Sequence, residues 1–148
     1  LTHEDRLLEI GALTEYQSRI INHIFHNLLR RDFSFGLVHG DLSLKNIMVS
    51  QDKKISIFDW GSAEAQIVPH HELGEILKTN LDVDSEDFKS FLEGYGLFEE
   101  GFHEIKEDLY NLMLLRSIDK LRWALDKHVE DVSRFIIAVK KMCEINSL

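Results

Sequence analysis

Residues 37–47 read Leu37-Val38-His39-Gly40-Asp41-Leu42-Ser43-Leu44-Lys45-Asn46-Ile47, and residues 55–61 read Ile55-Ser56-Ile57-Phe58-Asp59-Trp60-Gly61. The first segment leads into a short β-rich run and the second begins with another, and the polar residues 50–54 lie between them. Two short β-rich runs around a polar turn predict a β-hairpin. Because a hairpin folds back on itself, we expect the end of its second strand to bring Asp59 next to Asn46, with Asp41 close by.

These three polar residues carry oxygen donors and no soft ligands. Two oxygen ligands with a further carboxylate are the donors that Mg²⁺ prefers. Phosphoryl transfer uses such a metal to neutralise the transferring phosphate, and a carboxylate to orient the attacking hydroxyl. Protein kinases carry the same parts in a His-x-Asp-x-x-x-x-Asn loop that precedes a hairpin and a metal-binding Asp. The step from Asp41 to Asn46 matches that loop.

The motif His39-Gly40-Asp41 resembles the aminoglycoside phosphotransferase and choline kinase family, and so does Trp60 directly after Asp59. The run Pro69-His70-His71-Glu72-Leu73 is similar to the Pro-x-x-Asp-Leu of that family, with Glu in place of Asp. Residues 92–96 also resemble a segment that recurs in these kinases. The resemblance spans most of the chain, and its two central motifs are the specific ones.

The resemblance implies a small-molecule kinase that uses ATP as phosphoryl donor together with Mg²⁺. By position, Asp41 is then the catalytic base, and His39 braces the catalytic loop without touching substrate. Asn46 and Asp59 hold Mg²⁺ against the nucleotide phosphates. Glu72 ties down the backbone of the loop.

Lys45 has two interpretations. It lies next to Asn46 and can reach a nucleotide phosphate, which would make it a cofactor-binding residue, or it is an exposed lysine without a role.

The rest of the chain shows helical periodicity. Apolar residues at three- and four-residue steps predict helices over 13–31, 72–78, 103–126 and 132–145, and another helix capped by Asp84 or Ser85 that ends near Gly94. The fold class is therefore α+β and predominantly helical. The resemblance implies the C-terminal lobe of the protein kinase-like fold, with a catalytic loop and a small β-hairpin, as one domain over residues 1–148. We expect the N-terminal nucleotide-binding lobe to be absent from this chain, which would leave the isolated chain weakly active or inactive.

A small hydroxylated acceptor fits better than a protein. Gly40 stands where many protein kinases have the Arg that reads a phosphorylated activation loop. About a dozen residues separate Asp59 from Glu72, which leaves no room for a long activation segment. Aminoglycosides, choline-like amines, homoserine-like amino acids, macrolides and sugars all stay open as acceptors. The rival hypothesis is a non-catalytic, truncated kinase-like lobe that serves as a binding module.

Composition limits the partners. The formal net charge of −9 argues against binding to nucleic acid or anionic membranes. It would suit a cationic acceptor, but solvated helix faces are the favoured explanation of most of this charge. The apolar runs are far shorter than a membrane span, and the single cysteine, Cys143, excludes an internal disulfide. We therefore expect a cytoplasmic protein. Two histidine pairs, His23 with His26 and His70 with His71, lack a third ligand and are a weak indication of zinc.

Overall fold

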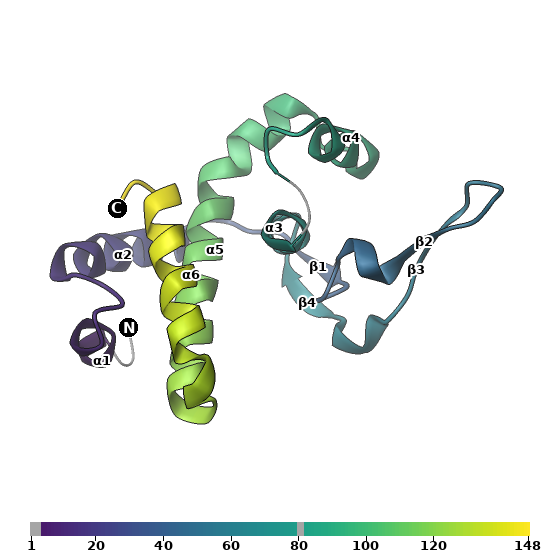
Figure 1. Cartoon of the computed structure of the whole chain (residues 1–148). Coiled ribbons are helices and arrows are strands. Elements are labelled where there is room, and N and C mark those ends of the chain that lie inside the picture. The colour runs from purple at the N-terminus through teal and green to yellow at the C-terminus, as the bar shows by residue number, and fades with distance from the viewer. Residues whose placement is uncertain (1–3, 80–81) are drawn as a thin grey trace. The chain divides into compact units, whose positions relative to one another are not determined.

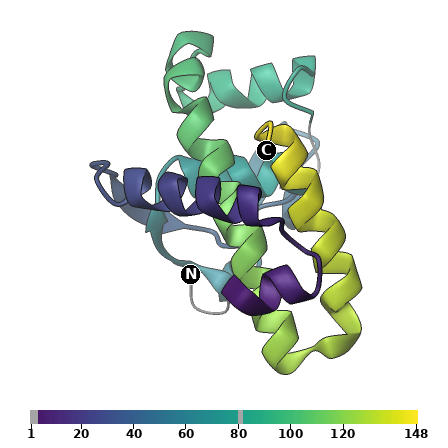
Figure 2. The same ribbon diagram turned by 90° about the vertical axis from the view of Figure 1, so that its left-hand side faces the viewer.

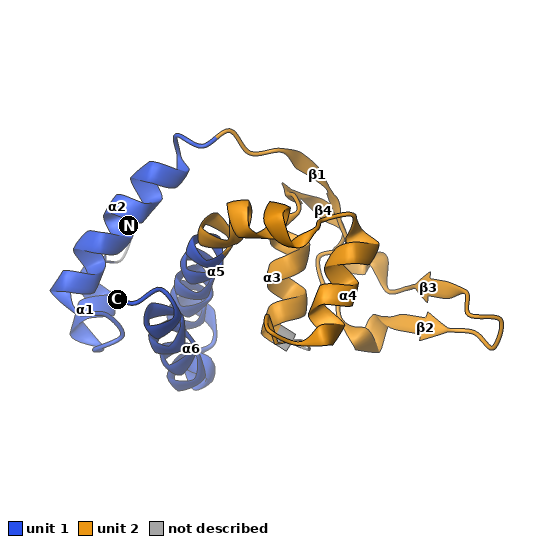
Figure 3. Cartoon of the chain, turned by 90° about the horizontal axis from the view of Figure 1, so that it is seen from above, with its two compact units in different colours: residues 1–31, 110–148 blue, residues 32–109 orange. Residues whose placement is uncertain are grey.

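A computed structural model describes residues 4–79 and 82–148 of the chain. The described residues are mostly helical and include two small antiparallel sheets, so the predicted α+β class is confirmed (Figure 1). The chain divides into two compact units (Figure 3). Unit 1 comprises residues 1–31 and 110–148, and unit 2 comprises residues 32–109. Across residues 4–79 and 82–148, no helix combines the length and the apolar character needed to cross a membrane.

Unit 1 is helical. Its helices are α1 (Glu4–Glu9), α2 (Glu15–Leu28), the part of α5 (Glu99–Lys127) that follows residue 109, and α6 (Val132–Ile145). Helix α6 runs back beside this part of α5 (Figure 2). The core of the unit is one cluster of buried apolar residues: Leu7, Ala12, Leu13, Ile21, Leu114, Ile118, Leu121, Leu125, Val139 and Cys143.

Local signals set the ends of α2. The Thr14 side chain accepts a hydrogen bond from the Gln17 amide, and the Gln17 side chain accepts one from the Thr14 amide, at 2.9 Å. This capping box satisfies two amide groups that the first turn of a helix leaves without partners. The predicted helix over 13–31 is therefore present but shorter at both ends, and α1 was not predicted.

Unit 2 contains the two sheets. Strand β2 (Ile47–Val49) pairs with β3 (Ile55–Ile57) in antiparallel register, with Ile47 opposite Ile57, and the predicted hairpin is confirmed. Strand β1 (Phe35–Val38) pairs with β4 (Glu64–Ile67), with Val38 opposite Glu64. The second sheet was not predicted. It pairs the strand just before the loop that starts at residue 39 with the strand just after the turn that follows Asp59.

Three helical segments complete unit 2: α3 (His70–Thr79), α4 (Glu86–Tyr95) and the first part of α5. The Ser85 side chain accepts a hydrogen bond from the Phe88 amide, so the predicted cap of α4 is confirmed. The helix ends at Tyr95, close to the predicted end near Gly94, and Gly96 caps it in the left-handed conformation that closes a helix, with φ of 81°. Phe88 is fully buried and packs edge-to-face on Phe102, with ring centroids 5.3 Å apart.

Candidate functional site

The loop begins where strand β1 ends. Gly40 has φ of 83°, and a Cβ atom at this position would lie 2.0 Å from the backbone oxygen of Ser62. Only glycine combines that backbone conformation with that close approach. The backbone after β1 therefore touches the backbone before β4, and this contact holds the two motif segments together.

His39 ties three parts of unit 2 to one another. The residue is 2% exposed. Its Nε2 lies 2.8 Å from the Phe58 carbonyl oxygen, and its Nδ1 accepts a hydrogen bond from the Asp41 amide at 3.3 Å. Because a carbonyl can only accept, Nε2 carries the proton and Nδ1 provides the lone pair. One neutral imidazole thus fixes the backbone on both sides of the site, which is the bracing position predicted for His39.

The backbone of His39 is held from helix α3. Its amide donates to Oε1 of Glu72 at 2.5 Å. Glu72 is 7% exposed, and its Oε2 is buried without a hydrogen-bond partner among the described residues. Burial, and after it the negative charge of Glu72, raise the pKa of the Tyr95 phenol. Tyr95, which lies in the segment 92–96 that carried part of the resemblance, thus feels the charge of the carboxylate that supports the loop.

Asp41 and Asn46 are bonded directly. Asn46 Nδ2 donates to the Asp41 carbonyl oxygen at 2.9 Å and to Asp41 Oδ2 at 3.3 Å. A 3₁₀ turn over Leu44–Asn46, closed by the Asn46 amide on the Ser43 carbonyl at 2.9 Å, places the asparagine for this contact. Because the amide nitrogen is used in this way, the amide oxygen of Asn46 is left to act as an acceptor or ligand.

Lys45 completes the surroundings of Asp41. Its Nζ lies 3.0 Å from Asp41 Oδ2. The Lys45 ammonium that bonds the carboxylate lowers the pKa of Asp41 from its usual value, and the Asn46 amide adds to the effect. Asp41 is therefore a carboxylate at neutral pH.

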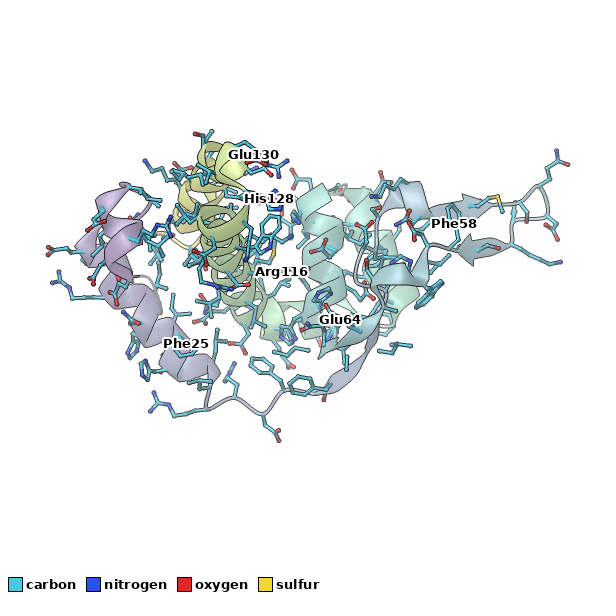
Figure 4. All side chains as sticks on the ribbon, turned by 90° about the horizontal axis from the view of Figure 1, so that it is seen from below. Phe25, Phe58, Glu64, Arg116, His128 and Glu130 are labelled. Atoms are coloured by element: carbon cyan, nitrogen blue, oxygen red, sulfur yellow. The ribbon has the colours of Figure 1, made fainter. Side chains whose placement is uncertain are left out.

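Phe58 connects Asp59 to the rest of the site. Its amide donates to the Asn46 carbonyl at 3.1 Å, and its carbonyl accepts from His39. Phe58 lies at the base of the hairpin (Figure 4). Asp59 follows directly, is exposed, and has left-handed backbone angles of φ 64° and ψ 56°. Aspartate tolerates this conformation better than most residues, and such angles concentrate at functional sites.

The predicted site residues therefore fall into one structure. Direct hydrogen bonds or ion pairs link five of them: His39, Asp41, Lys45, Asn46 and Glu72. Asp59 is connected to them through the backbone of its neighbour Phe58. Sequence reasoning missed Phe58 and Ser62 as parts of the site, because both act through their backbone atoms. The glycine at position 40 was the one available signal of the Ser62 contact.

The Trp60 ring packs against the imidazole of His39, with centroids 4.8 Å apart, and Trp60 Nε1 donates to the Ile57 carbonyl at 3.0 Å. Trp60, which carried part of the resemblance, thus packs on His39, the residue that fixes the backbone of the loop.

The geometry can be set beside known proteins. No curated protein and no solved structure matches the chain. The family model described as the phosphotransferase enzyme family matches residues 2–107, which is more than half of the chain and includes the whole loop, the hairpin and Glu72. The chain therefore belongs to the phosphotransferase enzyme family.

Proposed function

We propose that this protein transfers the γ-phosphoryl group of ATP, with Mg²⁺, to a hydroxyl of a small molecule. The observation that carries the proposal is the bonded unit of Asp41 and Asn46, joined through Phe58 to Asp59. It provides a carboxylate for a hydroxyl nucleophile and two further oxygen donors beside it.

Asp41 would act as the base. Its Oδ2 is already bonded to Lys45 and Asn46, and those bonds leave Oδ1 as the other acceptor oxygen of the carboxylate. An acceptor hydroxyl can therefore donate to Oδ1. As the hydroxyl oxygen forms its bond to the γ-phosphorus and the bond to ADP breaks, the proton passes to Asp41.

Asn46 and Asp59 would hold the metal. The amide oxygen of Asn46 and the carboxylate of Asp59 are hard donors of the kind that suits Mg²⁺, which commonly binds through one or two protein groups together with substrate phosphates. No cluster of three or more His, Cys, Asp or Glu side chains suited to a metal is found in the described part of the chain. Two hard donors fit a metal that takes its remaining ligands from nucleotide phosphates and water. When bound, Mg²⁺ would neutralise charge on the phosphates.

Two features support a small acceptor over a protein. The space beside Gly40 is filled by the Ser62 backbone, so an Arg that senses a phosphorylated loop cannot stand there. Between Asp59 and α3, the chain forms one 3₁₀ turn and strand β4, which pairs with β1. That segment is already committed to the fold of unit 2, so it offers no free length for docking a peptide.

The test is phosphorylation of a pooled panel of small alcohols with Mg-ATP, followed by mass spectrometry. It uses the 148-residue chain and a version extended upstream to the proposed nucleotide-binding lobe. Asp41→Asn is the inactivating variant. Asp52→Asn is its matched control, since Asp52 is also an exposed carboxylate paired with a lysine, Lys54, but lies in the hairpin turn.

A product that forms with wild type and Asp52→Asn, and disappears with Asp41→Asn, would establish the activity and identify the class of acceptor. Product from the extended version alone would establish that the upstream lobe is required. Folded protein that forms no product in either version would argue against the kinase and favour a non-catalytic binding lobe.

A further inference from the structure

We infer that Lys45 is a positioning residue that holds Oδ2 of Asp41, so that Oδ1 is presented to the acceptor hydroxyl. The inference rests on the proposed function and assigns to Lys45 a role other than phosphate binding.

The hydrogen-bond lengths separate the tasks of the two groups on Asp41. Asn46 makes its shorter bond, 2.9 Å, to the backbone oxygen of Asp41 and its longer one, 3.3 Å, to Oδ2. Lys45 approaches Oδ2 to 3.0 Å. Charge-assisted hydrogen bonds are also stronger than neutral ones. Asn46 therefore mainly fixes the backbone of the loop, and Lys45 mainly fixes the rotation of the carboxylate.

The two donors differ in burial. Within the 3₁₀ turn, Asn46 is buried with 5% exposure, whereas the side chain of Lys45 is 68% exposed. Lys45 thus reaches the carboxylate from the solvent side. The Asp41 side chain is itself 42% exposed, so without Lys45 water could hydrate Oδ2 and the carboxylate could turn.

A lysine on the base also makes that base weaker, so orientation has to matter more than basicity. Phosphoryl transfer passes through a loose transition state in which little proton transfer has occurred, and its catalysis is mainly positioning and electrostatics. A weak but well-oriented carboxylate suits this chemistry. The ion pair is exposed and contributes little to folding, so the variants should remain folded.

The first experiment needs no activity. NMR spectra of the 148-residue chain would be compared for wild type, Lys45→Met and Lys45→Arg. Lys54→Met serves as the matched control, since its ion pair with Asp52 is 2.8 Å long and exposed but lies outside the loop. We expect Lys45→Met to shift the Asp41 carboxyl carbon and the Asn46 side-chain amide and to speed exchange of that amide with water. Lys45→Arg should restore the wild-type signals and Lys54→Met should leave them unchanged.

The second experiment measures kinetics with whichever acceptor the panel identifies. Lys45→Met should lower kcat by roughly tenfold to a hundredfold with little change in KM for Mg-ATP, and Lys45→Arg should recover most of the loss. A raised KM for Mg-ATP with unchanged kcat would overturn the inference and assign Lys45 to a phosphate. Unchanged Asp41 and Asn46 signals in Lys45→Met would overturn it as well. Absence of phosphorylation by wild type counts against the proposed function, and the NMR result still decides whether Lys45 holds Asp41.

Discussion

The two units bury different kinds of side chain. Unit 1 packs around its core of ten buried apolar residues. Among its described residues, Ser18 is the one buried polar side chain. Unit 2 has apolar residues of its own but also buries six polar ones: His39, Ser43, Asn46, His70, Glu72 and Glu75. Buried polar groups are unfavourable unless they are hydrogen-bonded, so a unit that contains many of them is specified by its bonds as well as by its packing.

We infer that the apolar side chains of unit 1 mainly determine its stability, whereas the hydrogen bonds of unit 2 mainly determine the positions of the site residues. In unit 1 the loss of a methyl group removes packing energy. In unit 2 the loss of one acceptor frees a length of backbone that positions Asp41 or Asp59. The substitutions below test this separation in order of expected effect.

Gly40→Ala should have the largest effect. The new Cβ would meet the Ser62 backbone at 2.0 Å and would also strain a left-handed residue, so we expect roughly 4 kcal/mol of destabilisation. Gly96→Ala is the matched control, because Gly96 has φ of 81° with open space around it, and should lose only about 1 kcal/mol. Urea denaturation gives both values. Equal losses would mean that the contact with Ser62 is not tight.

Leu121→Ala should lower the free energy of unfolding by about 3 kcal/mol, because Leu121 is fully buried in the cluster of unit 1. Amide signals of the loop over residues 39–46 should stay in place at low denaturant. Large shifts of those signals would show that the packing of unit 1 determines the geometry of the loop, contrary to the separation proposed here.

Glu72→Ala should remove the acceptor of the buried His39 amide, at a cost of about 2 kcal/mol. Glu72→Gln keeps an oxygen in place and should lose less than about half of that. Hydrogen exchange at His39 reports the same difference, with fast exchange in the alanine variant alone. Similar behaviour of the two variants would show that the charge of Glu72 matters more than its hydrogen bond.

Much of the fold could be predicted because its signals are local. The hairpin follows from two β-rich runs around a polar turn, and α6 follows from its apolar spacing and agrees with the predicted range of 132–145. The pairing of β1 with β4 could not be predicted in this way. Its strands are four residues each and are separated by the whole hairpin, and the short polar–apolar alternation of Glu64-Ala65-Gln66-Ile67 does not say which strand it pairs with. For α4, the end near Gly94 was predicted to within a residue or two, and the left-handed backbone of Gly96 forms the cap.

The site was predicted through side chains and completed by backbone atoms. The spacing of Asp41 and Asn46 and the hairpin between Asn46 and Asp59 were sufficient to expect the three together. No sequence pattern marks the Phe58 carbonyl or the Ser62 oxygen, since every residue has these atoms. The contact of Lys45 with Asp41 also depends on the 3₁₀ turn, and the spacing of residues in a sequence motif does not specify that turn.

Thr14→Ala should cost about 1 kcal/mol, because it removes the side-chain acceptor of the α2 capping box. Thr14→Ser keeps the hydroxyl and should recover most of the loss. Thermal unfolding measures both. A loss in Thr14→Ser as large as that in Thr14→Ala would point to packing of the threonine methyl group instead of the cap.

The smallest expected effect concerns Ser18, the one buried polar side chain among the described residues of unit 1. Ser18 donates to Glu4, and Asn22 donates to the same carboxylate oxygen at 3.2 Å. The bond from Ser18, with a smaller contribution from Asn22, lowers the pKa of Glu4 from its ordinary value of 4.5. A carboxylate with a lowered pKa in the folded state stabilises above its unfolded pKa, and the stabilisation is lost as pH falls through the folded value. The difference in stability between wild type and Glu4→Gln should therefore be present at neutral pH and vanish as pH falls below about 4.5. In a Ser18→Ala background the difference should shrink at neutral pH. If it stayed the same there, the pH dependence would belong to other carboxylates, and the hydrogen bond between Ser18 and Glu4 would contribute nothing measurable to the stability of unit 1.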